Sequence, residues 1–243
     1  MTGKDPARSL ALLWGSAGKT GRSGLSVRTI VTAATEIADA QGLEAVTMRK
    51  VAEHLQAGTM SLYTHVPGKS ELTELMVDAA LGELYADLDE PARQGDWRAG
   101  MEFVAKRNWE MYLKHPWLMQ ASSARPNLGP NAVRKYEAEL RPLDGIGLSD
   151  LDMDGALSLV LGHVDSQARL QISLAQARKD QSDWDWWEEQ APILERLMTG
   201  MSLPVADRVG TASSEHYQGA AGPEHVLAFG LGRILDGIEQ LLK

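Results

Sequence analysis

The residues best suited to a chemical role form a run of small polar side chains with an arginine shortly before it. Thr59, Ser61 and Thr64 carry hydroxyl groups, and Arg49 carries a planar guanidinium. A guanidinium can pair with both major-groove acceptors of guanine, and hydroxyls can read other base edges in a groove about 12 Å wide. These residues indicate recognition of double-stranded DNA. For Arg49, the alternative is a solvated surface charge.

A second group of residues is suited to holding the DNA backbone rather than reading bases. Tyr63 offers a hydroxyl and Lys69 an ammonium at the end of one predicted helix and the start of the next, and Thr47 stands where a helix begins. A helix start adds amide donors for an anion, and phosphate contacts position a protein without specifying sequence. His65 either joins this group or packs against the next helix, and Met60 belongs to the same candidate DNA-binding set.

No other spacing in the sequence matches a catalytic, metal or nucleotide site. The chain has no cysteine, so thiolate and disulfide chemistry are excluded. Its six histidines do not form H-E-x-x-H or another ligand spacing, and no G-x-S-x-G elbow occurs. Gly18-Lys19-Thr20 lacks the first glycine of a phosphate-binding loop. We therefore expect neither an enzyme nor a metal site, and no cofactor.

Charge divides the chain into a basic head and an acidic remainder. The 243 residues carry a net charge of -9, yet residues 1–70 alone carry +3 and the rest carry -12. Hydrophobic residues make up 44%, which suits a globular chain of this length. No apolar run approaches the roughly 20 residues of a membrane span, so we expect a cytoplasmic protein without membrane contact.

The spacing of apolar residues predicts helices around the candidate DNA-binding residues. Apolar side chains between 27 and 38 share one helical face, and Gly42 follows where a left-handed cap would end the helix. Further helices are predicted over 47–55, 59–65 and 69–88. Two short helices joined by a few residues and supported on both sides match a helix-turn-helix. A small helical bundle without a DNA role is the alternative.

Residue identities favour the helix-turn-helix. Two motifs occur together, T-x-R-x-x-A from Thr47 and L-Y-x-H-V-x-x-K from Leu62. Through them, residues 26–86 closely resemble the DNA-binding domain of the tetracycline-repressor (TetR) family. The resemblance implies an all-α homodimer that blocks transcription until a small molecule binds its C-terminal domain. The turn departs from the family, because Gln56-Ala57 replaces a common Gly-Val, and positive φ there costs about 1 kcal/mol.

The resemblance and the charge pattern together predict three parts in an all-α chain. We expect a flexible basic arm over 1–24, a helix-turn-helix DNA-binding domain over 25–88, and a larger helical ligand-binding and dimerisation domain over 89–243. The last part resembles the TetR-like C-terminal domain more loosely. Its predicted helices span 96–114, 117–121, 131–143, 149–179, 183–200 and 223–243.

Two of these helices are expected to hold a second copy of the chain. Helix 223–243 is apolar on nearly two faces, so it needs two neighbours. With helix 149–179, it would form a four-helix interface between two subunits, as the resemblance implies. Two heads about 34 Å apart would then match one turn of the DNA duplex. A buried helix in a monomer is the alternative.

Aromatic side chains in the acidic part suggest a pocket for a small molecule. We expect Trp109, Tyr112 and Trp117 to face His163 and Gln167 across it, since rings with a few polar groups are typical of such sites. Each of the five could instead be an ordinary core residue.

One further segment, residues 183–189, mixes acidic side chains with three tryptophans. It could be a lid for a cationic ligand or an amphipathic surface helix, and we favour the surface helix. The whole sequence predicts a ligand-responsive repressor that binds a palindromic operator as a homodimer and is released by a small molecule. The alternative is a dimeric small-molecule-binding protein without specific DNA binding.

Overall fold

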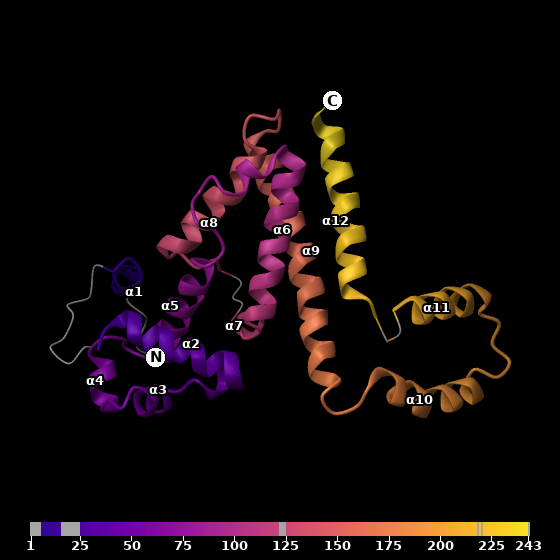
Figure 1. Ribbon diagram of the computed structural model, residues 1–243, viewed down its shortest axis with the longest axis horizontal. Helices are drawn as coiled ribbons and strands as arrows, with labels where there is room; N and C mark the ends of the chain where they lie inside the picture. The colour runs from indigo at the N-terminus through magenta and orange to yellow at the C-terminus, as the bar shows by residue number, and fades with distance from the viewer. Residues whose placement is uncertain (1–5, 16–24, 122–124, 218, 220, 243) are drawn as a thin grey trace.

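Every regular element in the described part of the chain is helical. The computed structural model describes residues 6–15, 25–121, 125–217, 219 and 221–242 (Figure 1). The predicted all-α fold class is confirmed. The α-helices are α1 (Pro6–Leu13), α2 (Val27–Gln41), α3 (Met48–His54), α4 (Thr59–Tyr63), α5 (Lys69–Leu81), α6 (Trp97–Lys114), α7 (Leu118–Ala121), α8 (Pro130–Leu140), α9 (Asp150–Ala177), α10 (Asp183–Leu197), α11 (Pro204–Tyr217) and α12 (Pro223–Glu239).

Helices α2 to α5 form the head, which has its own apolar core. The side chain of Ser26 accepts a hydrogen bond from the Thr29 amide and so caps α2, and Gly42 ends that helix with φ +83° as expected. The residues at the centre of the core are wholly buried: Ile30, Val51, Leu62, Val66, Leu72 and Met76. Burying such a core is the main term that stabilises a small helical unit.

Part of the expected flexible arm is helical. Residues Pro6–Leu13 form α1, and Leu12 is buried in the head core. The indole Nε1 of Trp14 donates to the carbonyl of Leu128 at 3.0 Å, far along the chain. Helix α1 is only eight residues long, about two turns, so its apolar residues do not repeat over enough turns for periodicity to predict it. Residues 1–5 and 16–24 of that arm lie outside the described part of the chain.

The helix predicted over 69–88 ends seven residues early, at Leu81. After Gly82 the chain turns, and Leu84 is buried in the head core. The guanidinium of Arg107 on α6 binds the carbonyl oxygens of Glu83 and Leu84 at 3.2 and 2.9 Å. Those two carbonyls therefore bind another helix and do not continue the helical ladder of α5. Helix α4 is also shorter than its predicted range of 59–65 and ends at Tyr63.

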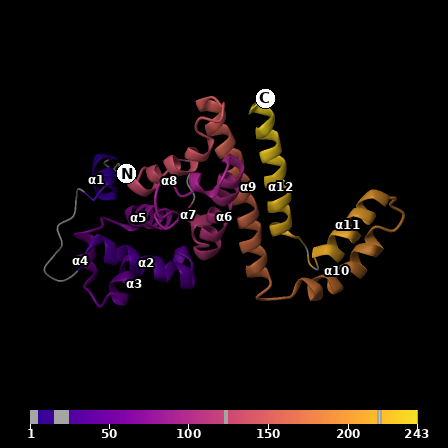
Figure 2. The ribbon, with the colours of Figure 1, turned by 45° about the horizontal axis from the view of Figure 1, so that its top comes forward.

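Helices α6 to α12 form the body. Helices α6, α9 and α12 lie side by side, and α8 packs against both α5 and α9 (Figures 1 and 2). The body core is centred on Met101, Val104, Leu143, Val160, Val164 and Leu235, all with no exposed surface. Asp96 caps α6 and Ser149 caps α9, each through its side chain, where the sequence predicted helix starts.

A hairpin of α10 and α11 extends away from the body (Figures 1 and 2). Neither helix contains a buried residue. The sequence predicted α10 but not α11, which contains Gly, Ser, Thr and Val, all weaker helix formers than Ala or Leu.

Candidate functional site

The two short helices of the head are fixed by a cap and by core packing. The hydroxyl of Thr47 accepts a hydrogen bond from the Lys50 amide at 3.1 Å, as an N-cap does. Met48, Val51 and Ala52 are buried under α3, and Leu62 is the buried residue of α4. Because α4 has one inward side chain, its other residues face outward.

The turn between α3 and α4 keeps the left-handed geometry that the sequence predicted. Gln56 has φ +52° and is the one non-glycine residue with positive φ in the described chain. The Ala57 amide donates to the carbonyl of Ala52 at 2.9 Å and closes the turn. The departure from glycine therefore changes the energy of the turn rather than its shape, since a side chain in this region costs about 1 kcal/mol or more.

The outer surface of α4 is polar, small and largely open to solvent. Met60 is 76% exposed and Tyr63 is 43% exposed. Ser61 and Thr64 are exposed as well, and the Thr64 hydroxyl donates to the Ser61 carbonyl. Thr59 is half-buried at the start of the helix. The predicted base-reading residues are thus brought together on one accessible face.

Arg49 projects from the first turn of α3 with 85% of its side chain exposed. Its Nε donates to Glu53 Oε1 at 2.7 Å, one helical turn along, and this hydrogen bond raises the pKa of Arg49. Both partners are exposed, so the pair is screened by water and salt and can be exchanged for a contact to DNA.

The remaining candidates for phosphate contacts lie at the start of α5. Lys69 is exposed, and its Nζ donates to the Leu43 carbonyl at 3.2 Å, which leaves further N–H groups of the ammonium for an anion. His65 is half-buried, and it lines a cavity of about 400 Å³ between α1, α2 and α5. The contact of each residue with DNA stays a prediction.

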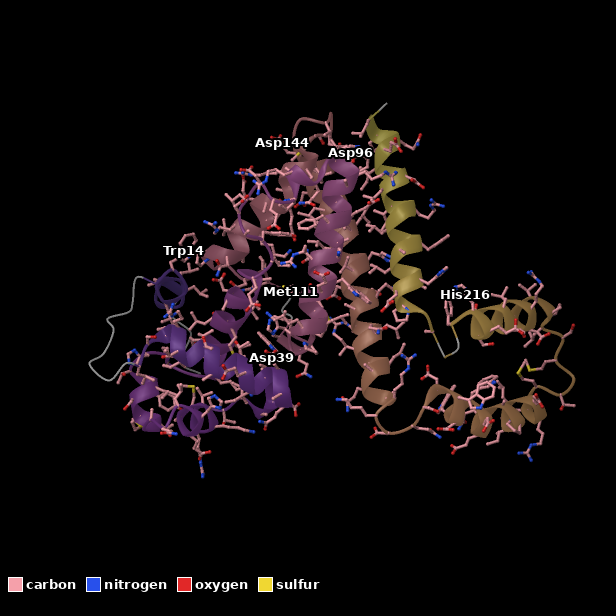
Figure 3. The ribbon with its side chains drawn as sticks, viewed as in Figure 1. Trp14, Asp39, Asp96, Met111, Asp144 and His216 are labelled. Carbon is pink, nitrogen blue, oxygen red and sulfur yellow. The ribbon has the colours of Figure 1, made fainter. Side chains whose placement is uncertain are left out.

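A hydrogen-bonded junction that the sequence analysis did not predict joins the head to the body. Asp39 Oδ1 on α2 accepts from His115 Nδ1 and from Trp117 Nε1, both at 2.7 Å. His115 is 2% exposed and Trp117 is 1% exposed. Figure 3 shows Asp39 at the end of α2 that lies nearest to α6. No spacing signal could identify this pair, because 76 residues separate Asp39 from His115.

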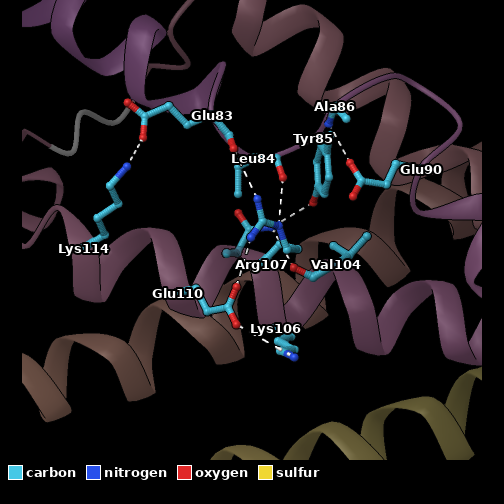
Figure 4. Close-up of polar contacts among 11 residues, drawn as sticks. Glu83, Leu84, Tyr85, Ala86, Glu90, Val104, Lys106, Arg107, Glu110 and Lys114 are labelled. Atoms are coloured by element: carbon cyan, nitrogen blue, oxygen red, sulfur yellow. Dashed lines mark hydrogen bonds and ion pairs between the residues drawn. The ribbon is translucent and has the colours of Figure 1, made fainter. Parts of the chain in front are cut away.

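The junction continues to the segment that follows α5. Glu83 accepts a hydrogen bond from Lys114, and its Oε2 lies 3.3 Å from Nε2 of His115. Burial alone would raise the pKa of Glu83, but these two donors outweigh it and lower the pKa. Arg107 binds the backbone of the same segment (Figure 4). The segment that follows α5 is thus held to α6 by side-chain and backbone hydrogen bonds.

Asp78 provides another link between α5 and the body. Its Oδ1 accepts from the amides of Asn131 and Ala132 in the first turn of α8, at 3.1 and 3.0 Å. Burial raises the pKa of Asp78, while the hydrogen bonds from α8 oppose that rise. The Asp78 carboxylate thus supplies the cap that the N-terminal amides of α8 need.

The five residues predicted to line a pocket are divided between the head core, the body core and α9. Trp117 packs into the head core, whereas Trp109 packs against the body core and Tyr112 contacts both. His163 Nε2 lies 3.1 Å from the Leu227 carbonyl on α12, and Gln167 is half-buried further along α9. Trp117 and His163 thus have defined partners within the protein, and a ligand role for any of the five stays a prediction.

Helices α9 and α12 pack on each other and leave apolar side chains uncovered. Leu235 and Ile238 are buried on one side of α12, but Phe229 is 62% exposed on the other. On α9, Val160 and Val164 are buried. The other large apolar residues that these helices leave exposed are Leu151, Leu159, Leu170, Val226 and, just after α12, Leu241.

The segment 183–189 begins α10, on the projecting hairpin. Trp184, Trp186 and Trp187 are 67%, 45% and 44% exposed. Ser182 caps the helix by accepting from the Asp185 amide at 3.1 Å. The segment is thus an exposed helix in this chain, and the lid interpretation remains open.

Metal and membrane features are absent from the described residues. Their histidines, aspartates and glutamates form no group of three that could bind a metal ion. Among the described helices, none combines the length and hydropathy needed to cross a bilayer.

Comparison with known proteins matches both parts of the chain. Residues 30–76 match the model of bacterial regulatory proteins of the tetR family, and residues 90–242 match the tetracyclin repressor-like C-terminal domain. The HTH-type transcriptional repressor DrrR1 of Streptomyces coeruleorubidus is 38% identical over 98% of this chain and 87% of its own length.

Solved structures show the same similarity. The Streptomyces coelicolor TetR family protein ActR in complex with (S)-DNPA aligns with a TM-score of 0.67 and 27% identity, over 89% of this chain and 98% of that chain. Its complex with actinorhodin aligns with a TM-score of 0.65 and 29% identity, over 88% and 95% of the two chains.

Proposed function

The chain belongs to the TetR family of bacterial transcriptional regulators, and we propose that it is a repressor that binds a palindromic operator as a homodimer and is released by a small molecule. The observation that carries the proposal is the outward face of α4 with the exposed Arg49 beside it, held on a buried scaffold. The 38% identical relative DrrR1 is a transcriptional repressor, which supports the sign of regulation. Members of this family are transcription factors rather than enzymes.

We assign the contacts with DNA bases to Thr59, Met60, Ser61, Thr64 and Arg49. Hydroxyls and a guanidinium supply hydrogen bonds, and the thioether side chain supplies apolar contact to a thymine methyl. A second set of residues holds phosphates: Thr47, Tyr63, His65 and Lys69. On this assignment, substitution of a phosphate-contacting residue weakens binding to all DNA sequences equally, whereas substitution of a base-contacting residue reduces the preference for the operator sequence.

The dimer is assigned to α9 and α12 of two subunits. Their uncovered apolar side chains, with Phe229 at the centre of α12, support a four-helix interface. Burial of that face by a second copy would remove a large apolar patch from water. The same pairing would set the two α4 helices about 34 Å apart, one turn of duplex DNA.

Release is assigned to a small molecule that binds the body. The ActR complexes hold (S)-DNPA and actinorhodin, which supports a small organic effector for this chain too. The contacts of Asp39, Asp78 and Arg107 with the neighbouring unit would pass a shift of the body to the head. Coupling of about 1 to 3 kcal/mol changes affinity roughly 5- to 150-fold, which is enough to empty an operator.

The test is capture of sheared genomic DNA from the source organism by the purified full-length protein, at fixed salt because phosphate contacts depend on ionic strength. The double variant Arg49→Ala Tyr63→Ala is compared with Arg93→Ala, which removes an exposed cation of the body. We expect one enriched inverted repeat with the wild type and with Arg93→Ala, and its loss with the double variant. Equal recovery by all three proteins would instead indicate a dimeric ligand-binding protein without specific DNA binding.

A further inference from the structure

The buried side-chain amide of Asn108 on α6 has an oxygen that accepts no hydrogen bond from any described residue. Asn108 has no exposed surface, and its Nδ2 donates to the Val104 carbonyl at 2.9 Å and to Glu139 Oε1 at 2.6 Å. Its Oδ1 is the one buried side-chain polar atom in the described residues that lacks a hydrogen-bond partner. Buried polar atoms in proteins are nearly always paired, so this atom requires an explanation.

The orientation of the amide is fixed by its neighbours. Rotating it by 180° would set Oδ1 against the carboxylate of Glu139 and the carbonyl of Val104, both of which are acceptors. The unpaired oxygen therefore has to point away from both. Only a group from outside these contacts can supply its hydrogen bond.

A second polar group without a partner lies one helical turn further along α6. Residues four apart share a helix face, so Tyr112 and Asn108 lie on the same side. No hydrogen bond within the described residues involves the Tyr112 hydroxyl, and burial, with the nearby Asp165 and Glu139, raises its pKa to about 12. Tyr112 packs against both the head core and the body core, at the boundary between them.

The charges around these two groups determine which ligand they can accept. Glu139 is 1% exposed and is held by the Tyr85 hydroxyl at 2.8 Å and by Lys135 at 2.5 Å. Asp165 faces Tyr112 from α9, together with Arg169. Lys135 and Arg169 balance these two carboxylates, so the surroundings carry no surplus charge that would attract an ion. An ionised carboxylate has no proton to donate to Asn108 Oδ1, whereas a neutral hydroxyl has one.

We propose that Asn108 Oδ1 and the Tyr112 hydroxyl are the polar anchor of the effector site, which takes a neutral organic molecule that carries a hydroxyl donor and rejects organic anions. This inference rests on the proposed ligand-responsive function and specifies the chemistry of its effector. It also connects binding to the head, because the adjacent Arg107 holds the segment after α5 (Figure 4). A ligand that displaces α6 at Asn108 therefore shifts the end of α5.

The experiment measures binding of three fragments of similar size, phenol, toluene and benzoate, to the full-length protein by calorimetric titration. One hydrogen bond to a buried acceptor is worth about 1 kcal/mol, roughly a fivefold change in affinity, and leaving that acceptor unpaired costs more. We expect phenol to bind at least about fivefold more tightly than toluene or benzoate. In Asn108→Leu the phenol-to-toluene ratio should fall to about one.

Tyr112→Phe and Tyr136→Phe are the matched pair that keeps the test valid if Asn108→Leu does not fold. Both remove one hydroxyl, but that of Tyr136 is exposed and bonded to Asp154. We expect Tyr112→Phe to reduce the phenol preference and Tyr136→Phe to leave it unchanged. A wild type that binds phenol no better than toluene or benzoate, or a preference that survives in Tyr112→Phe, overturns the inference.

Failure of this inference is distinguishable from failure of the proposed function. If the wild type captures an operator but shows no preference for phenol, the proposed repressor function is supported and the proposed polar anchor is refuted. Phenol preference that depends on Tyr112, without an enriched operator, would keep the anchor and remove the repressor. A crystal structure of the phenol-soaked protein with only water at Asn108 Oδ1 would also overturn the anchor.

Discussion

Replacement of Asp39 by alanine should destabilise the protein, because it removes the acceptor shared by two buried hydrogen-bond donors. His115 and Trp117 are almost completely buried, and both donate to Asp39 Oδ1. An unpaired buried donor costs about 1–3 kcal/mol, so two would cost about 2–6 kcal/mol. The Asp39 side chain is 34% exposed, so water can reach part of the vacated space. We therefore expect a loss of about 2–4 kcal/mol in the free energy of unfolding.

The assay is urea unfolding followed by circular dichroism at one fixed protomer concentration, because the stability of a dimer depends on concentration. Asp39→Asn keeps a carbonyl acceptor at this position and should lose less than half as much as Asp39→Ala. Asp87→Ala removes an exposed carboxylate that pairs with Arg93 and should lower the free energy of unfolding much less than Asp39→Ala, because exposed ion pairs contribute little. In a Trp117→Phe background, Asp39→Ala should cost about 1–3 kcal/mol less, since one donor is already absent. An Asp39→Ala protein as stable as Asp87→Ala would refute the junction.

Three further predictions concern the turn, the junction and the subunit interface. Gln56→Gly should raise the free energy of unfolding by about 0.5–1 kcal/mol, because glycine adopts the positive φ of this turn without strain. Gln56→Ala should give no gain. An equal gain from both variants in urea unfolding would contradict this explanation. The pKa of Glu83 is lowered in the folded state, so the wild type loses stability as the pH falls below about 4.5. Glu83→Gln should make the free energy of unfolding less dependent on pH in this range. Equal pH dependence of the two proteins in urea titrations would count against the junction. Phe229→Glu should give single protomers in sedimentation velocity, while Val133→Glu on α8 should remain dimeric; a dimeric Phe229→Glu protein would exclude the proposed interface.

The parts of the fold that depend on neighbouring residues were predictable from sequence. Thr47 caps α3, Asp96 caps α6, and Gly42 ends α2, all within a few residues of the predicted positions. Each of these features depends on local hydrogen bonds, so a short stretch of sequence contains the signal. The left-handed turn at Gln56 was predictable from the family resemblance, which indicated a position where glycine is usual.

The features that were not predictable depend on partners distant in sequence. Beyond the end of α5, the carbonyls of Glu83 and Leu84 bind Arg107 of α6, and nothing near Leu81 in the sequence encodes that contact. The pairing of Trp117 Nε1 with Asp39 and the packing of its ring in the head core also depend on residues far along the chain. The unpaired amide oxygen of Asn108 could likewise be found only from coordinates, since it reflects the placement of Glu139.

The projecting hairpin of α10 and α11 receives little stabilisation from the rest of the chain. Isolated helices of 14 or 15 residues are marginal in water, and no residue of these two helices is fully buried. The large apolar residues that they expose outside the 183–189 segment are Ile193, Leu194, Leu197, Val205 and Val209, with Met201 and Leu203 between the helices. A subunit on its own therefore has some 30 residues whose helicity little in the chain maintains, and it offers proteases and aggregating neighbours an apolar strip. Local unfolding of these helices should therefore cost less free energy than unfolding of either core, and limited proteolysis should cut the chain here first.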